Sequence, residues 1–212
     1  MLGAWRRRRL ARRAPAGPLR DYLATPPRPG ALLAVDVETT GLDPHTDHLL
    51  SIGWVPVDAG RVRLAGATRL VVSADAEVGR SATIHGITDD DLGHGVALHE
   101  ALDRTLAALT GRTMVAHHAP VEEGFLGAAV LATYGVRPLF TTVDTLAVER
   151  ERMARRGEDP GPGGLRLPAC RERHGLPAAP LHDALSDALA CAELHLAQTA
   201  PGPVSPRGSG RG

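Results

Sequence analysis

The pattern of apolar and polar positions along the chain predicts a group of strands in its first third. Residues 31–37 form a nearly continuous apolar run, which is typical of a central strand buried on both faces. Residues 48–57 and 61–72 have the composition of two further strands, and Asp58-Ala59-Gly60 between them favours a tight turn. We therefore expect an antiparallel hairpin beside the central strand. Later short apolar runs predict two more strands, at 113–117 and 139–143.

Helical spacing of apolar residues begins after this hairpin. Leu98, Leu102, Leu106 and Leu109 recur every three or four residues and predict a helix over 96–109. Proline is tolerated in the first turn of a helix, where its missing N–H has no intrahelical partner. Further helices are predicted at 120–134 after Pro120, from Thr142 or Asp144 to about 155, at 165–174 and at 182–200.

Strand, hairpin and then alternating helices and strands indicate an α/β fold with a mixed sheet flanked by helices. We expect the folded domain to span residues 31–199. The segment before it, 1–30, is basic and Pro-rich and is predicted to be a partly disordered arm with a short helical turn at 19–23. The segment 200–212 contains mainly Pro, Gly and Ser and is predicted to be a disordered tail.

The formal net charge of zero conceals an uneven distribution of charge. Residues 1–30 contain eight Arg and one Asp, whereas the remainder of the chain has an excess of acids. A basic arm on an acidic body is an electrostatic footprint for nucleic acid. A solvated, Arg-rich end without a partner is the other interpretation, and the sequence leaves both open.

Length and composition narrow the class of protein. A chain of 212 residues with 43% apolar and 23% charged residues suits one well-cored globular domain. No apolar run approaches the roughly 20 residues of a membrane span, and no apolar segment of a secretory signal follows the N-terminal arginines. Cys170 and Cys191 lack metal-site spacing and fit reduced thiols, so we expect a cytoplasmic protein.

Acidic residues at three separated places carry the candidate chemistry. Asp36 and Glu38 alternate with Val35 and Val37, so both carboxylates project from one face of the first strand. Two acids on a buried strand repel each other and lose hydration, which is costly unless a cation lies between them. A twisted strand end with both acids in water is the alternative.

The second and third acidic segments are ambiguous when each is taken alone. Glu122 and Glu123 lie in the first turn of a predicted helix, where the helix dipole favours acids without any function. His182 and Asp187 are five residues apart, about 140° around a helix, so His182 fits better in the approach to the last helix. Asp183 is expected to be an N-cap or a first-turn acid of that helix.

Together these segments resemble the DEDDh family of 3′–5′ exonucleases. The family's DxETTGL motif is matched by residues 36–42, its VAHNAxFDxxFL motif is similar to VAHHAPVEEGFL at 115–126, and its HxxxxD motif is matched by His182 to Asp187. An HGIT segment, which family members place near the terminal nucleotide, is found at 85–88. The resemblance covers about 31–199.

The resemblance implies a ribonuclease H-like mixed five-stranded sheet flanked by helices, and a set of roles for the site. Asp36, Glu38 and Asp187 would ligate two Mg²⁺ or Mn²⁺ ions, the second-motif acid Glu122 would hold one of them, and His182 would be the general base. The chain departs from the family pattern at Glu122 and His118, which replace Asp and Asn, and at Val121, which replaces Phe. Glu123 is the fallback ligand. Substrate contacts are expected at Thr39, Gly41, Leu42, His85 and His118.

The implied activity is hydrolysis of phosphodiester bonds at 3′ ends, with release of 5′-mononucleotides. The expected partners are single-stranded 3′ ends of DNA or RNA, with a DNA polymerase or a repair protein as a further partner left open, and no membrane. The alternative function is a catalytically weak module that binds nucleic acid or a polymerase, because the second motif is altered and the arm is basic.

Overall fold

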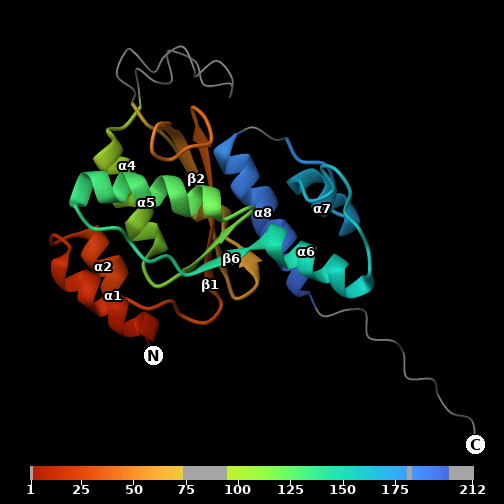
Figure 1. The fold of residues 1–212 in the computed structure, drawn as a ribbon, viewed down its shortest axis with the longest axis horizontal. Helices are drawn as coiled ribbons and strands as arrows, with labels where there is room; N and C mark the ends of the chain where they lie inside the picture. Colours follow the sequence, from red (N-terminus) through yellow and green to blue (C-terminus); the bar gives the residue numbers. More distant parts are fainter. Residues whose placement is uncertain (1, 74–94, 181–182, 201–212) are drawn as a thin grey trace, which may run out of the picture.

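The computed structural model describes residues 2–73, 95–180 and 183–200. Within these residues a six-stranded mixed sheet carries helices on both faces (Figure 1). The strand order is β3-β2-β1-β5-β6, and β4 also pairs with β2. The predicted α/β class is therefore confirmed. The strands are β1 (Ala31–Thr39), β2 (Leu49–Asp58), β3 (Arg61–Val62), β4 (Thr68–Val71), β5 (Thr113–Ala116) and β6 (Thr142–Asp144).

The central strand β1 pairs antiparallel with β2 and parallel with β5. Its interior is almost wholly buried, as the apolar run predicts. The expected hairpin is also present, since β2 and β3 pair through Asp58 and Arg61 around a two-residue turn. Ala59 and Gly60 in that turn have φ values of 50° and 72°, as the tight turns of hairpins require.

Among the described residues the sheet has six strands where the sequence predicts five, because the segment 61–72 is divided. A short 3-10 helix, η1 (Leu64–Gly66), separates β3 from β4. Opposite this break lies Pro56, whose carbonyl accepts a hydrogen bond from the Arg63 N–H at 2.8 Å. Because proline has no N–H to return that bond, the ladder is interrupted at this point.

The predicted helices are present with small shifts at their ends. Asp144 caps α6 by accepting from the N–H groups of Leu146 and Ala147, and Gly135 and Gly157 end α5 and α6 at a φ of 70°. That left-handed conformation is the usual role of glycine at a helix C-terminus. The helices are α4 (Leu98–Leu109), α5 (Pro120–Tyr134), α6 (Thr145–Arg156), α7 (Leu167–Arg173) and α8 (Ala184–Thr199).

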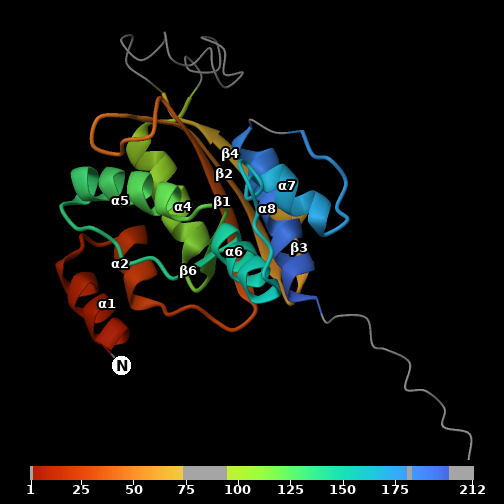
Figure 2. The same cartoon turned by 45° about the vertical axis from the view of Figure 1, so that its right-hand side comes forward.

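The two faces of β1 meet different layers (Figure 2). Leu33, Val35 and Val37 belong to the larger core, which includes residues of α4 and α5. Ala34 belongs to a smaller core with Cys191 and Ala192 of α8. Because side chains alternate along a strand, Asp36 and Glu38 share the α8 face with Ala34. This arrangement brings the first turns of α8 toward the acids of β1.

The N-terminal segment is more ordered than predicted. It forms α1 (Leu2–Arg13) and α2 (Pro18–Ala24), and Leu19, Tyr22 and Leu23 of α2 are each only 1% exposed within the larger core. Spacing of three and four residues places these side chains on one face of a helix, which explains why so short a segment packs. The boundary proposed at residue 30 stays a prediction.

Of the predicted tail 200–212, residues 201–212 lie outside the described part of the chain. Among the described helices, none is both long enough and apolar enough to span a bilayer.

Candidate active site

Three carboxylates from two distant segments converge on the α8 face of the sheet. Asp36 and Glu38 come from β1, and Asp187 comes from the first turn of α8. One oxygen from each side chain lies within 4.8 Å of the others. The prediction that separated acids meet at one place is confirmed for these three residues. We refer to them as the carboxylate cluster.

A glycine on β2 allows the first turn of α8 to lie close against the sheet. Gly53 pairs with Asp36 across the β1–β2 ladder. A Cβ at position 53 would lie 2.2 Å from the carbonyl carbon of Ala184, a separation that no real side chain adopts. The first turn of α8 therefore rests directly on the backbone of β2. Sequence reasoning missed Gly53, since a glycine inside an apolar strand gives no sign of what lies above it.

The N-terminus of α8 is fixed by the residue before its first turn. Asp183 accepts hydrogen bonds from the Ser186 N–H at 3.1 Å and the Ser186 hydroxyl at 3.0 Å, which confirms its expected role as N-cap. Its other oxygen is 2.7 Å from Nε of Arg69 on β4. This ion pair ties the start of α8 to the sheet. No pattern in the sequence pointed to Arg69.

The electrostatics of the cluster favour a bound cation. Burial raises the pKa of Asp36 well above its usual range, and the charges of Glu122, Asp187 and Glu38 raise it further. Such a group is unfavourable when ionised unless positive charge is nearby. Carboxylate oxygens are the ligands that Mg²⁺ and Mn²⁺ prefer. The donor set therefore fits a divalent metal site.

Glu122 lies beside the cluster but outside its 4.8 Å limit. Its side chain is only 3% exposed in the first turn of α5, and burial raises its pKa to about 8. Its Oε2 has no hydrogen-bond partner among the described residues. Of the neighbouring charges, that of Glu122 has the largest effect on Asp36. Glu122 is therefore near enough to Asp36 for its charge to act on that carboxylate.

Glu123, the fallback ligand, has a different environment. Its Oε1 accepts a hydrogen bond from the Thr142 hydroxyl at 2.5 Å, at the start of β6. Successive residues of a helix differ by about 100° in direction, so Glu122 and Glu123 do not face the same surroundings. The geometry favours Glu122 as the acid of the second motif.

The two histidines before α5 differ in role. His117 Nδ1 is 2.9 Å from the Thr145 hydroxyl and its Nε2 is 2.9 Å from the Leu165 carbonyl. Burial lowers its pKa, so this ring is a neutral structural link. His118 is exposed, and its φ of 74° lies in the left-handed region. Its N–H donates to Asp144 Oδ1 at 3.0 Å. The family's Asn and this His are both residue types that tolerate that conformation.

The turn after β1 carries three of the predicted substrate contacts. The Thr39 hydroxyl donates to the Gly41 carbonyl at 2.6 Å. A Cβ at Gly41 would lie 2.4 Å from Oδ2 of Asp47, so only glycine fits there without rearrangement. Leu42 is 88% exposed. Their contacts with substrate, and that of His118, stay predictions. The predicted general base His182 and the predicted contact His85, with the rest of its HGIT segment, lie outside the described residues.

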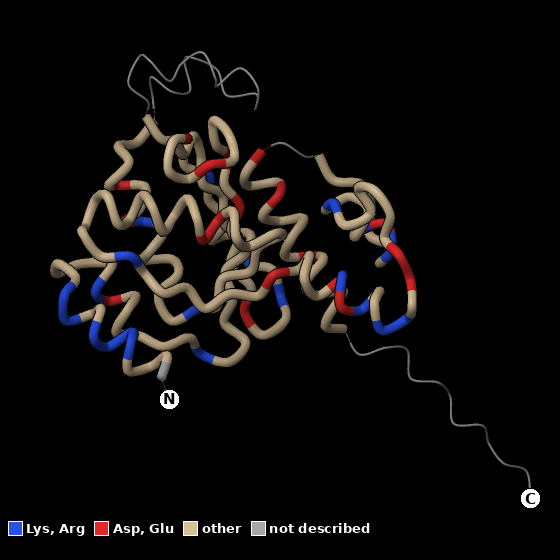
Figure 3. Tube along the Cα trace, in the orientation of Figure 1, with Lys and Arg blue, Asp and Glu red and all other residues tan. Residues whose placement is uncertain are grey.

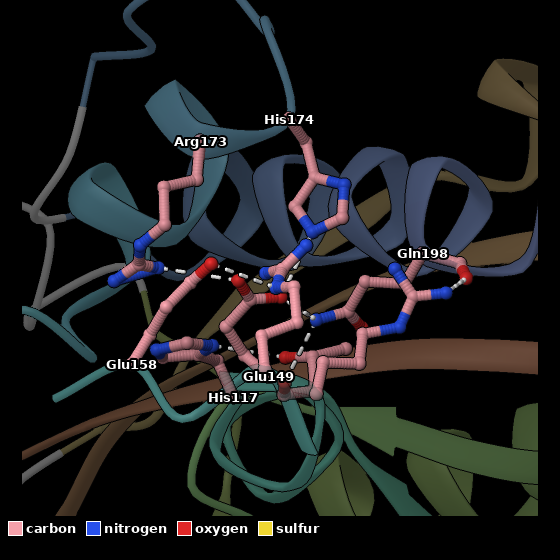
Figure 4. A network of polar contacts seen from close by, with 9 residues as sticks. His117, Glu149, Glu158, Arg173, His174 and Gln198 are labelled. Carbon is pink, nitrogen blue, oxygen red and sulfur yellow. Dashed lines mark hydrogen bonds and ion pairs between the residues drawn. The ribbon is translucent and has the colours of Figure 1, made fainter. Parts of the chain in front are cut away.

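A second buried carboxylate belongs to a structural network and was not anticipated. Glu149 of α6 is fully buried and pairs with His174 at 2.8 Å and with Arg173 at 3.3 Å (Figure 4). Gln198 of α8 donates to the same carboxylate at 3.1 Å. Burial alone would raise the pKa of Glu149, but these hydrogen bonds and the charge of Arg173 lower it. The network joins α6 and the end of α7 to α8.

Comparison with known proteins places the site in a family. A family model described as exonuclease, of the RNase T type, matches residues 33–195. The chain belongs to this exonuclease family. The DNA polymerase III of PolC type from Thermotoga maritima is 29% identical over 165 residues, covering 77% of this chain. The chain spans only 11% of that protein's length.

Solved structures of similar fold agree with this membership. An E. coli exonuclease I complex with single-stranded DNA superposes with a TM-score of 0.67 at 17% identity, covering 80% of this chain and 40% of that one. The nuclease domain of 3′hExo, described as a DEDDh family member bound to rAMP, gives 0.63 at 13% identity, covering 79% and 90%. The predictions of a ribonuclease H-like fold, of the DEDDh family and of an enzyme of the 3′–5′ exonuclease class are confirmed.

Proposed function

We propose that this exonuclease domain hydrolyses the terminal phosphodiester bond of a single-stranded 3′ end, in DNA or RNA, and releases a 5′-mononucleotide. The observation that carries the proposal is the convergence of Asp36, Glu38 and Asp187 within 4.8 Å at one face of the sheet. Retention of these acids, together with Glu122 and His182, matches the chemistry of phosphodiester cleavage rather than simple binding.

Two divalent ions, Mg²⁺ or Mn²⁺, are the proposed cofactors. Asp36, Glu38 and Asp187 would hold them, with Glu122 supplying the fourth carboxylate. When bound, such ions stabilise the attacking and leaving oxygens of an in-line displacement. Glu122 contributes a buried oxygen without a hydrogen-bond partner among the described residues, which is the environment expected of an acid that acts beside a cation.

The side chains supply proton transfer and orientation. His182 is the proposed general base, because an imidazole accepts a proton from water near neutral pH. The residue that follows it, Asp183, is anchored by Arg69 and by Ser186, so the chain enters α8 from a fixed point. The exposed apolar side chain of Leu42, with Thr39 and Gly41 in the same turn, is the proposed contact for the terminal nucleotide, and His85 and His118 are further proposed contacts.

The biological setting is proposed from two observations. The PolC-type relatives support a role beside a DNA polymerase, although a repair or turnover enzyme that acts alone has the same chemistry. The two buried free thiols, Cys170 and Cys191, support a reducing, cytoplasmic location.

The second candidate is the catalytically weak binding module. One observation favours it: Glu122 lies outside the compact carboxylate cluster, so the second metal position is less completely built. An assay of product formation separates the two candidates directly.

The test uses single-stranded DNA and RNA of one sequence, labelled at the 5′ end, with Mg²⁺ or Mn²⁺. The exonuclease predicts a ladder of shortened products that chelation of the metal abolishes. Asp36→Asn should abolish the ladder, whereas Glu100→Gln, which changes an exposed acid of α4, should leave it intact. Absence of products from wild type on both strands would refute the exonuclease and favour the binding module.

A further inference from the structure

A groove lies between the N-terminal helix α1 and the first turn of α5, outside the carboxylate cluster. Its volume is about 730 Å³. The α1 wall belongs to a segment that precedes the residues matched by the exonuclease family, which begin at 33. The groove is lined by Trp5, Arg6, Arg9, Leu10 and Arg13 of α1, by Pro120, Glu123 and Gly124 of α5, and by residues 137–140.

The charge of this groove is strongly positive. Four guanidinium groups line it, from Arg6, Arg9 and Arg13 on one wall and Arg137 on the other. The acid in the lining is Glu123, whose carboxylate is engaged by the Thr142 hydroxyl. Figure 3 shows that basic residues are concentrated along α1, whereas acidic residues gather around the central strands and α8. A groove of this charge attracts a chain of phosphates.

The orientation of α1 is fixed by one inward arginine. The guanidinium of Arg7 donates to the Leu139 carbonyl at 2.6 Å and to the Tyr22 carbonyl at 2.5 Å, and it lies 4.6 Å from the centre of the Tyr22 ring. Only 9% of Arg7 is exposed. Because this contact sets the rotation of the helix, α1 presents Arg6, Arg9 and Arg13 to the groove.

An exposed aromatic ring completes the groove. Trp5 is 61% exposed, although tryptophan is normally largely buried in a folded protein. The guanidinium of Arg9 lies 5.7 Å from the centre of its ring. An exposed ring beside arginines is the combination by which proteins hold single strands, because every base has a face that can stack.

The groove and the candidate active site share the first turn of α5, which carries Glu122 and Glu123. Glu123 lines the groove, and the charge of the preceding residue, Glu122, acts on Asp36 of the cluster. A strand with its 3′ end at the cluster can therefore extend past the start of α5 into the groove.

We propose that the groove between α1 and α5 binds the phosphodiester backbone of a single-stranded nucleic acid several nucleotides upstream of its 3′ end, with a base stacked on Trp5. The inference rests on the proposed exonuclease function for the placement of the 3′ end. Arg6, Arg9, Arg13 and Arg137 contact phosphates, and this grip distinguishes long strands from dinucleotides.

The test compares two pairs of arginines on the same helix at the same spacing. Arg9→Gln/Arg13→Gln removes two groove residues, and Arg8→Gln/Arg12→Gln removes two exposed residues outside the groove. Binding of labelled dT15 and U15 is measured by fluorescence anisotropy in a chelator, so that no hydrolysis occurs. The groove pair should weaken binding about tenfold and lower the salt slope by about 1.4, since each lost phosphate contact contributes about 0.7 on a single strand. The exposed pair should change both much less.

Three further measurements sharpen the result. Trp5→Leu should weaken binding at least about fivefold, because base stacking on an aromatic ring is lost. The groove pair should raise KM for dT15 and leave the hydrolysis of thymidine 5′-monophosphate 4-nitrophenyl ester unchanged, because that small substrate does not reach the groove. A binding preference for dT15 or for U15 distinguishes DNA from RNA as the strand held.

Equal weakening by both arginine pairs would overturn the proposal, because it would indicate a diffuse effect of charge. Wild-type binding by the groove pair would also overturn it. So would tight binding of poly-glutamate with no binding of either oligonucleotide, which would point to an acidic protein segment as the ligand. If wild type hydrolyses neither the ester nor dT15, the exonuclease function fails, and the binding measurements in chelator still decide whether the groove holds a strand.

Discussion

Asp36 and Gly53 face each other across the β1–β2 ladder, and the glycine is the point at which α8 rests on the sheet. The missing side chain of one residue therefore controls the distance between the acids of β1 and Asp187 of α8. The φ angle of Gly53 is not positive, so the backbone conformation at this position would accept alanine. The close backbone of Ala184 and Leu185 opposes a Cβ there.

We expect Gly53→Ala to lower kcat by about 100-fold, because a displacement near 1 Å in a catalytic constellation has an effect of that size. Stability should fall by about 1–3 kcal/mol through overpacking. Steady-state cleavage of dT15 and chemical denaturation measure the two effects. Gly3→Ala is the control, since a Cβ there meets nothing within 4 Å. Full activity of Gly53→Ala would show that α8 can shift without consequence for the site.

The assignment of the second-motif acid gives another prediction. We expect Glu122→Ala to lower kcat by at least about 100-fold and Glu122→Asp to retain a substantial part of the activity, because aspartate keeps the carboxylate and shortens it by one methylene. Glu123→Ala should remain close to wild type in kcat, since its carboxylate bonds to Thr142. Kinetics with Mn²⁺ at saturating dT15 provide the measurement. Loss of activity in Glu123→Ala but not in Glu122→Ala would reverse the assignment.

Much of the fold was predictable because its determinants are local. The buried run of β1, the turn at Asp58-Ala59-Gly60, the helix beginning at Pro120 and the cap at Asp183 each follow from a short pattern of residue types. The gathering of Asp36, Glu38 and Asp187 was predictable from motif resemblance and is present in the structure.

The features that were missed depend on contacts between distant segments. The break after β3 follows from Pro56 on the neighbouring strand, and α1 is held by Arg7, whose guanidinium reaches a carbonyl 132 residues away. A run of arginines indicates a solvated arm until one of them is seen to be buried. Gly53 is likewise understood only once α8 is placed above it.

The left-handed backbone at His118 predicts an unusual order of stability among variants at this position. We expect His118→Asn and His118→Gly to preserve stability to within a few tenths of a kcal/mol, because both residues accept a φ of 74°. His118→Val should destabilise by about 1–3 kcal/mol, since a β-branched side chain is strained there. His118 is exposed, so lost burial does not contribute.

Chemical denaturation of the three His118 variants checks this order. His99→Val is the matched control at an exposed helical histidine, and it should change stability by at most a few tenths of a kcal/mol, because His and Val have similar helix propensities. Similar losses for valine at both positions would argue against strain at His118.

The buried network around Glu149 predicts how stability depends on pH. Its hydrogen bonds and the charge of Arg173 lower the pKa of Glu149 below that of an unfolded chain, so the folded state favours the ionised carboxylate. The resulting stabilisation is fully present above the unfolded pKa, roughly 4.5 for glutamate, and is lost as the pH falls through the folded value. At pH 7, Glu149→Gln should lower the free energy of unfolding by about 3 kcal/mol, the scale expected when one partner of a buried ion pair is removed.

The difference between wild type and Glu149→Gln should therefore shrink as the pH is lowered from 5 toward 3, because the wild-type carboxylate becomes protonated and loses the same attraction. Urea titrations across this range measure it. Glu151→Gln is the control on the same helix, since its pair with Arg155 is exposed and should contribute at most a few tenths of a kcal/mol. A difference for Glu149→Gln that stays constant across this range would mean that packing of the side chain, rather than its charge, holds α6 and the end of α7 to α8.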